Sequence, residues 1–168
     1  DILRRAAALL RDRADRIATR MVMDQGKPLA QAHQEVQAAA LIMEWSAEEG
    51  RRTYGRIIPA SIPGVQWSVV KEPVGPVAAF TPWNFPGIIP ARKIASALAV
   101  GCTMVIKPAE ETPSTVLEIA RALADAGLPK GVLNVVHGVP STVSERLIAH
   151  PAIRKISFTG STAVGQHL

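Results

Sequence analysis

The spacing of apolar residues changes along this chain of 168 residues, and the change predicts two kinds of structure. In the N-terminal part, apolar side chains recur at intervals of three and four positions, which predicts two amphipathic helices. Glycine and proline predict that the first helix runs from Ile2 to near residues 26–28, and that the second ends near Gly50. Pro59 then breaks the chain, and the alternation of residues 66–71 predicts a strand.

After Pro73 the pattern changes to short apolar runs that alternate with longer helical segments. The runs predict strands, and the segments between them predict helices. We predict strands at residues 74–80, 103–107, 132–136 and 154–158, and helices at 88–100, 113–126, 142–149 and from Thr162 onward. Strands that alternate with helices form parallel βαβ units. The predicted fold class is therefore α/β, with N-terminal helices followed by a doubly wound parallel sheet.

Composition and charge narrow the class of protein. Hydrophobic residues make up 48% of the chain and charged residues 20%, which is ordinary for a folded globular protein. The net charge of +5 raises the hypothesis of a nucleic-acid-binding module. However, the arginines that carry much of it alternate with Asp12 and Asp15, which is typical of a solvated helix face. We therefore expect no nucleic-acid partner.

Two observations bear on the compartment. Cys102 is the single cysteine, so no disulfide can form within the chain, and a reducing compartment is favoured. The apolar run at residues 94–106 is shorter than the ~20 residues that a membrane span needs. We expect a cytoplasmic protein without a membrane partner, and we predict no metal site.

Three polar motifs each follow a predicted strand, where an open parallel sheet binds its ligands. They read Phe80-Thr81-Pro82-Trp83-Asn84-Phe85-Pro86, Lys107-Pro108-Ala109-Glu110 and Phe158-Thr159-Gly160-Ser161-Thr162. Together they predict one nucleotide site approached from three sides. The first loop lacks the spacing G-x-G-x-x-G, so a standard Rossmann phosphate cradle is disfavoured.

Glu110 can be interpreted from its position alone. An acidic residue beyond the second strand of a βαβ unit typically accepts hydrogen bonds from the adenosine ribose, and Lys107 beside it can donate to a ribose hydroxyl. The alternative is that Glu110 only stabilises the N-terminus of the next helix through the helix dipole. Spacing does not decide between the two.

The motifs resemble those of the NAD(P)-dependent aldehyde dehydrogenase family, most closely its succinate-semialdehyde dehydrogenase-like subgroup, over almost the whole chain. The resemblance implies an N-terminal helical part of the cofactor domain (1–64), a strand of a bridging or oligomerisation sheet (65–72) and a Rossmann-like NAD-binding part (73–168). It also implies that the catalytic cysteine and general-base glutamate lie beyond Leu168. We therefore expect the front part of an enzyme, inactive alone, whose full-length form is a homo-oligomer.

The resemblance further implies roles for individual residues. The Asn84 amide would donate a hydrogen bond in the oxyanion hole, and Trp83 would line the cofactor channel. Ser161 would bind the pyrophosphate at a helix N-terminus, and Gly165 would permit close packing. The other cofactor-binding residues that it implies are Phe80, Thr81, Pro82, Lys107, Glu110, Gly138, Thr159 and Gly160.

Simpler alternatives stand beside these roles. Asn84 is also a residue type that caps helices, Trp83 could fill the core, and Gly138 suits any turn. Cys102 leads into an apolar strand without a neighbouring histidine or lysine, so we interpret it as structural and not as a nucleophile.

Substrate and cofactor preferences also follow from the resemblance. The succinate-semialdehyde subgroup has an Arg-Lys pair at the position of Arg92-Lys93, and its arginine contacts the distal carboxylate of the substrate. We predict that Arg92 selects a semialdehyde such as succinate semialdehyde, the alternative being a surface arginine. Glu110 would repel a 2′-phosphate, which favours NAD over NADP. The alternative function is a non-catalytic nucleotide-binding or interaction domain derived from the same fold.

Overall fold

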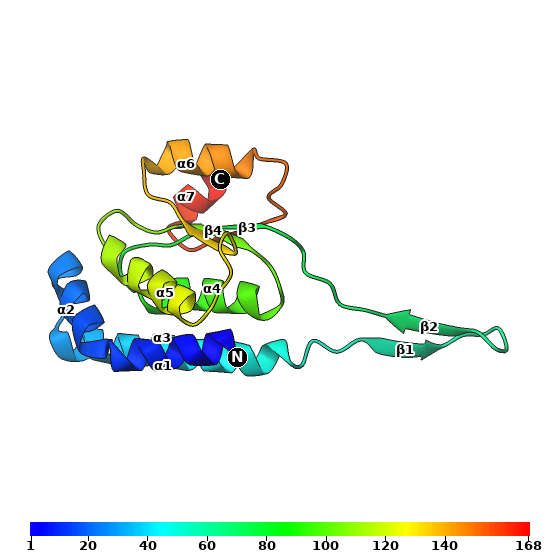
Figure 1. The fold of residues 1–168 in the computed structure, drawn as a ribbon. Coiled ribbons are helices and arrows are strands. Elements are labelled where there is room, and N and C mark those ends of the chain that lie inside the picture. The colour runs from blue at the N-terminus through cyan, green and yellow to red at the C-terminus, as the bar shows by residue number, and fades with distance from the viewer.

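The computed structural model describes every residue from Asp1 to Leu168. Three helices come first, an antiparallel hairpin follows, and strands then alternate with helices (Figure 1). The first part comprises α1 (Ile2–Asp12), α2 (Ala14–Gln25), α3 (Leu29–Gly50), β1 (Arg56–Pro59) and β2 (Gln66–Val69). The alternating part comprises β3 (Val77–Phe80), α4 (Ile88–Ala99), β4 (Met104–Lys107), α5 (Pro113–Asp125), β5 (Leu133–Val135), α6 (Pro140–Ile148), β6 (Lys155–Phe158) and α7 (Thr162–His167).

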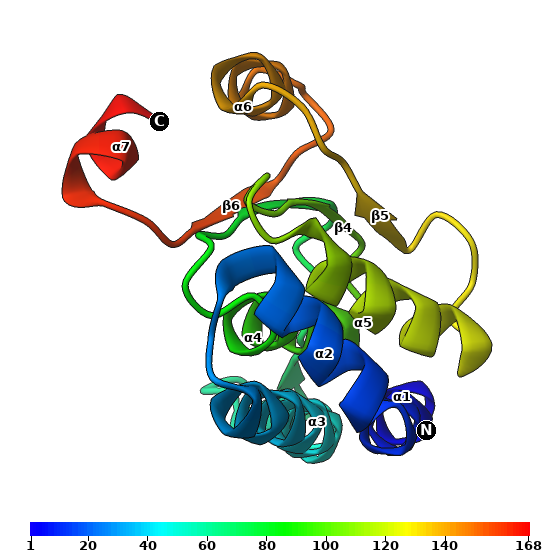
Figure 2. The ribbon, with the colours of Figure 1, turned by 90° about the vertical axis from the view of Figure 1, so that its left-hand side faces the viewer.

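Strands β3 to β6 form one parallel sheet in the order β5-β4-β3-β6. Helices α4 and α5 cover one face of this sheet, and α6 and α7 lie on the other (Figure 2). The prediction of a doubly wound parallel sheet is thus confirmed. Pairing aligns Phe80, the last residue of β3, with Lys107 on β4 and Phe158 on β6. The three strands that precede the polar motifs therefore end side by side.

Helices α1 and α3 form a further layer beneath α4 and α5, and α2 stands at one end of this layer (Figure 1). The main core joins these helices to the sheet, and many of its contact positions are alanines, which let the helices approach closely. The largest fully buried side chains of the core include Leu10, Ile17, Met21, Met43, Ile94, Ile106 and Ile119. None of the helices combines the length and the apolar character that crossing a membrane would require.

The prediction of a single first helix was wrong, because the chain breaks at Arg13. This residue has φ −102° and ψ 12°, and it ends α1 and precedes α2. The Arg13 side chain pairs with Asp125 Oδ2 at 2.7 Å. Both α1 and α2 pack against α3 and α5, so each half buries its own apolar face. Because both helices bury an apolar face, the helical spacing of apolar residues continues across Arg13, and the sequence pattern does not reveal the break.

One buried carboxylate ties the helical layer to α5. Glu118 on α5 is fully buried, and it accepts hydrogen bonds at 2.6–2.8 Å from Arg16 and Arg20 on α2 and from Arg121 on its own helix. All three guanidinium groups are about half exposed. Part of the positive charge of the N-terminal helices therefore pairs with a carboxylate inside the protein.

The hairpin of β1 and β2 projects away from the rest of the molecule (Figure 1). Strand β2 lies within the predicted segment 66–71, but β1 was not predicted because Pro59 indicated a break. Pro59 is the last residue of β1 and pairs with Gln66 next to the turn, where a two-stranded ribbon tolerates proline. Ile57 and Trp67 are exposed on the ribbon. Its assignment to an oligomerisation sheet stays a prediction.

Candidate functional site

The three polar motifs meet at one edge of the sheet. Hydrogen bonds carry the strand pairing one residue further than the strands themselves: the Thr81 N–H donates to Lys107 O at 3.3 Å, and the Thr159 N–H donates to Phe80 O at 3.1 Å. These bonds hold Thr81 beside the end of β4 and Thr159 beside the end of β3. The prediction that the motifs approach one place from three sides agrees with this geometry.

A cavity of about 330 Å³ opens where the three motifs meet. Eight of the predicted cofactor-binding residues line it: Phe80, Thr81, Pro82, Trp83, Lys107, Glu110, Thr159 and Gly160. The lining also contains residues to which the sequence analysis gave no binding role: Ala109, Glu111, Pro140, Ser144, Phe158, Val164 and Leu168. Most of these come from α6, α7 and the turns around them, whose packing over the sheet edge no local motif specifies.

Lys107, Glu110 and Glu111 are the charged side chains that line this cavity, and the first two form an ion pair. The Lys107 side chain is only 7% exposed, whereas that of Glu110 is 44% exposed, and Lys107 Nζ lies 2.6 Å from Glu110 Oε1. Partial burial alone would raise the pKa of Glu110, but the hydrogen bond from Lys107 and the positive charge nearby hold that pKa below its usual value. Glu110 is therefore an ionised acceptor near neutral pH.

The alternative role of Glu110 at the N-terminus of α5 is filled by another residue. Asp24 Oδ2 accepts hydrogen bonds from the Ser114 N–H at 3.1 Å and from the Ser114 hydroxyl at 2.6 Å. The first turn of α5 itself contains no acidic residue. Because Asp24 caps this helix, Glu110 remains available to a ligand in the cavity.

Thr81 adds a polar group without a partner to the same cavity. Its side chain is buried, and its Oγ1 makes no hydrogen bond within the protein. Buried hydroxyls are nearly always hydrogen-bonded, so an unpaired one beside a cavity indicates a place for a polar ligand. A nucleotide with ribose and phosphate oxygens fits a site lined by Thr81, Lys107 and Glu110.

Three predicted cofactor residues flank the cavity without lining it. Gly138 precedes α6 with φ 150°, and a Cβ there would meet Val143 Cγ2 at 3.2 Å. Ser161 caps α7, because its Oγ accepts a hydrogen bond from the Val164 N–H at 3.3 Å. Gly165 packs on the ring of Phe158, to which an added Cβ would approach within 3.1 Å. The close packing expected of Gly165 is thus present, and the pyrophosphate role of Ser161 stays a prediction.

Asn84 lies at the exposed tip of the loop between β3 and α4. No side chain of this loop caps α4; instead, Glu35 from α3 accepts hydrogen bonds from the Gly87 and Ile88 N–H groups at 2.7 and 3.2 Å. The alternative role of Asn84 as a helix cap is therefore excluded. Its amide is free to bind a ligand, and the oxyanion role stays a prediction.

A second cavity of about 510 Å³ lies on the other side of this loop. Phe85, Ile88 and Ile89 give it apolar walls, and Arg92 and Lys93 give it positive charge. Thr159 completes the lining, and it is the one residue that this cavity shares with the first. The two cavities therefore adjoin at Thr159.

A model of the aldehyde dehydrogenase family matches residues 1–168. The chain belongs to the aldehyde dehydrogenase family. It is 51% identical, over 99% of its length, to the 4-(hydroxymethyl)benzenesulfonate dehydrogenase TsaD1 of Comamonas testosteroni, and 47% identical over 99% to the succinate-semialdehyde dehydrogenase [NADP(+)] GabD of Escherichia coli. It spans about a third of those relatives, 35% of each.

Solved structures agree with this assignment. The fold matches the crystal structure of succinate-semialdehyde dehydrogenase from Burkholderia pseudomallei with a TM-score of 0.96 and 48% identity, covering 99% of this chain and 34% of that one. The matched part carries the three motifs and both cavities. The resemblance stated from the sequence is thus confirmed at the level of the family.

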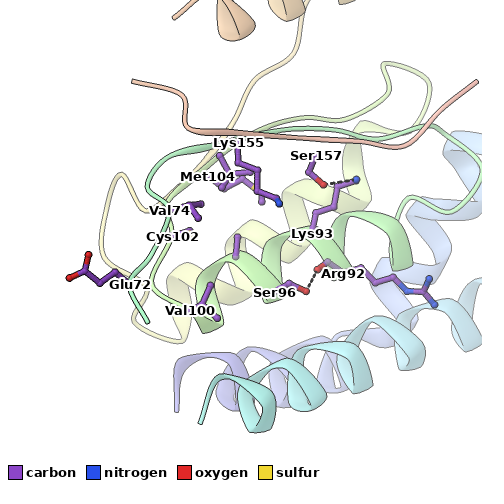
Figure 3. Close-up of a pocket in the computed structure, with 12 residues that line it drawn as sticks. Glu72, Val74, Arg92, Lys93, Ser96, Val100, Cys102, Met104, Lys155 and Ser157 are labelled. Carbon is purple, nitrogen blue, oxygen red and sulfur yellow. Dashed lines mark hydrogen bonds between the residues drawn. The ribbon is translucent and has the colours of Figure 1, made fainter. Parts of the chain in front are cut away.

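Cys102 occupies a third cavity of this aldehyde dehydrogenase chain, of about 370 Å³, between α4 and the sheet (Figure 3). The residue is 4% exposed and unpaired, and it belongs to the hydrophobic core. No histidine lines this cavity, but Lys93 and Lys155 do, so the expectation of no neighbouring lysine was wrong. The cavity also shares Arg92 and Lys93 with the second cavity. The structural interpretation of Cys102 therefore agrees with its place in the fold.

Figure 3 also shows how Arg92 and Lys93 diverge on α4. Lys93 points to the sheet, where its Nζ donates to Ser157 Oγ at 2.9 Å, and burial lowers its pKa. Arg92 extends away from the Cys102 side and makes no ion pair, so its guanidinium can serve a ligand in the second cavity.

Proposed function

We propose that the protein containing this chain catalyses NAD-dependent oxidation of an aldehyde that carries a distal anionic group, giving the carboxylic acid. The observation that carries the proposal is the meeting of two cavities at Thr159: one holds Lys107 and Glu110, and the other combines apolar walls with Arg92. A nucleotide in the first cavity and an aldehyde in the second would therefore be neighbours. This arrangement suits transfer between two bound molecules.

The proposed reaction uses groups both inside and outside this chain. When bound, NAD accepts a hydride from the substrate. A cysteine outside this chain would add to the aldehyde to give a thiohemiacetal, whose loss of hydride leaves a thioester. A general base outside this chain would then activate water, which hydrolyses the thioester to the acid and frees the cysteine. Asn84 would donate its amide N–H to the oxyanion that develops on the substrate, a contact whose loss typically lowers the rate ~10²–10³-fold.

Glu110 supports NAD over NADP. Its carboxylate is ionised and lies in the cavity, where it can accept hydrogen bonds from ribose hydroxyls. The same negative charge would repel a 2′-phosphate. The name of one relative, the E. coli enzyme, includes NADP(+). We therefore propose the preference for NAD from Glu110 and not from the relatives.

Arg92 supports an anionic substrate. A guanidinium group at the wall of an otherwise apolar cavity binds carboxylates and sulfonates in preference to neutral groups. The names of several relatives describe such molecules: succinate semialdehyde, glutarate semialdehyde, 3-sulfolactaldehyde and 4-(hydroxymethyl)benzenesulfonate. We propose a semialdehyde, with succinate semialdehyde as the first to test.

The experiment measures NADH formation by the full-length protein with succinate semialdehyde and with butanal, a neutral aldehyde of the same carbon number. Arg92→Gln should lower kcat/KM for succinate semialdehyde about 10- to 100-fold, because a charge-assisted pair is worth about 1.5–3 kcal/mol. The rate with butanal should stay unchanged. Arg146→Gln, an exposed arginine on α6, serves as the matched control.

Three outcomes would contradict parts of the proposal. Equal losses with both aldehydes would exclude Arg92 as an anion contact. NAD binding without any turnover would favour the non-catalytic nucleotide-binding domain. Absence of NAD binding would overturn the cofactor site itself.

A cytoplasmic location and a homo-oligomeric whole protein stay predictions. The exposed Ile57 and Trp67 of the hairpin support the second, because apolar residues on a projecting ribbon favour burial against another surface. Sedimentation of the full-length protein would test it.

A further inference from the structure

A buried ion pair between Lys27 and Glu35 contacts the loop that carries Asn84. Glu35 on α3 is 2% exposed at its side chain, and Lys27 in the turn before α3 is 11% exposed; the two form a direct salt bridge. One oxygen of Glu35 accepts the Gly87 and Ile88 N–H groups, and the other binds Lys27. Through these hydrogen bonds, the Glu35–Lys27 ion pair is attached to the start of α4.

Lys27 continues the connection to the loop itself. Its Nζ donates to the backbone carbonyl of Asn84 at 3.0 Å, and it lies 4.4 Å from the centre of the Phe85 ring. The Lys27 ammonium group therefore contacts three groups at once: the Glu35 carboxylate, the Asn84 carbonyl and the face of the Phe85 ring. The Asn84 side chain makes no hydrogen bond of its own, so the contact of its backbone carbonyl with Lys27 helps to hold the residue from which that amide extends.

We propose that Lys27 and Glu35 are positioning residues that set the Asn84 amide for the reaction, an inference that rests on the proposed oxyanion role of Asn84. Stability alone does not account for such a pair, since replacing a buried ion pair by packed apolar residues is often neutral or stabilising. An apolar pair could fill the space, but it could bind neither the Asn84 carbonyl nor the N–H groups of α4. The charges thus give the loop one fixed position.

The test is a double-mutant cycle in the full-length enzyme with Lys27→Met and Asn84→Ala, measured at saturating NAD and aldehyde. Lys27→Met should lower kcat about 10- to 100-fold, because displacement of a catalytic group by ~1 Å costs up to ~10²-fold. The thermal midpoint should fall, because Glu35 loses its partner while still buried, whereas NAD affinity should change little. In the Asn84→Ala background the same substitution should have no further effect on kcat. Lys130→Met, at an exposed site before β5, is the control.

The outcomes separate this inference from the proposed function. If the two substitutions lower kcat multiplicatively, Lys27 does not act through Asn84, and the positioning role is wrong while the oxyanion role stands. If Asn84→Ala retains the wild-type kcat, the oxyanion role fails, and the positioning role fails with it.

A second variant keeps the test decisive if Lys27→Met does not fold. Glu35→Gln preserves one oxygen acceptor for the Gly87 N–H and removes both the charge and the second oxygen, which bind Lys27. It should lower kcat severalfold with KM for NAD unchanged, and this loss should also disappear in the Asn84→Ala background. A loss that persists there would overturn the inference.

Discussion

Gly160 gives the sharpest test of the nucleotide cavity. Its backbone does not lie in the left-handed region, so alanine is compatible with the backbone and only the added methyl group matters. A Cβ at this position would lie 2.4 Å from Phe158 Cζ and 2.9 Å from Cε2. The ring would have to retreat by about 1 Å to restore the 3.4 Å of an ordinary contact. Phe158 itself lines the cavity, so its displacement disturbs the place where the nucleotide would bind.

The magnitude follows from that displacement. Overpacking by one methyl group typically costs about 1–3 kcal/mol, which corresponds to a 5- to 150-fold weakening of binding. We expect the substitution to weaken NAD binding more than it lowers the free energy of unfolding. The Phe158 ring is only partly buried, so in the free protein it can turn into the cavity, where the nucleotide would otherwise bind. The assay is calorimetric titration of the full-length protein with NAD, with the thermal midpoint measured alongside.

A second substitution distinguishes this mechanism from general damage. Phe158→Leu removes the ring atoms that a Cβ would meet, so Gly160→Ala should weaken binding much less in that background. The reasoning is refuted if Gly160→Ala binds NAD as tightly as the wild type. It is refuted equally if the loss is the same with leucine at position 158.

The remaining predictions concern charge and burial elsewhere in the chain. Glu110→Ser should shift the ratio of kcat/KM for NADP to that for NAD upward by at least about tenfold, because it removes the charge that repels a 2′-phosphate; steady-state rates with both cofactors check this. Cys102→Ala should keep full activity and lower the free energy of unfolding by about 1 kcal/mol, and loss of activity in a stable variant would show a chemical role. Glu118→Ala should cost about 1.5–3 kcal/mol in urea denaturation, since it removes charge-assisted hydrogen bonds from three arginines that can still reach water. The hydrogen bond from Arg11 holds the pKa of Glu44 below its ordinary value of 4.5 against the opposing effect of burial, so this pair stabilises the fold above that pH and less as the pH falls through the lowered pKa. Glu44→Gln should therefore reduce the acid dependence of the free energy of unfolding, by no more than about 1 kcal/mol for so exposed a pair, as urea denaturation at several pH values would measure.

The alternating part of the chain was predictable because each element carries its own local signal. Apolar runs gave the strands β3 to β6, and Pro113 with Gly127 marked the limits of α5 closely. The clustering of the three motifs followed from one topological rule, since parallel strands in a doubly wound sheet present their carboxyl ends together. Eight of the predicted cofactor residues consequently line one cavity.

What the sequence did not reveal depends on contacts between distant segments. The break at Arg13 is set by packing on α3 and α5, and β1 exists only because β2 pairs with it. Glu35 stands 52 residues before the Gly87 N–H that it accepts, in a helix whose apolar pattern gives no reason to expect a buried charge. The lining contributed by α6 and α7 likewise arises from how these helices sit over the sheet edge.

Thr159 is a common wall of the two cavities, and this has a thermodynamic consequence. A ligand that moves or immobilises Thr159 from one side changes the surface offered to a ligand on the other. The affinities of the two ligands are then linked, and the linkage must be reciprocal: whatever factor the nucleotide imposes on aldehyde binding, the aldehyde imposes on nucleotide binding. In such a protein, dissociation constants measured one ligand at a time do not describe the ternary complex.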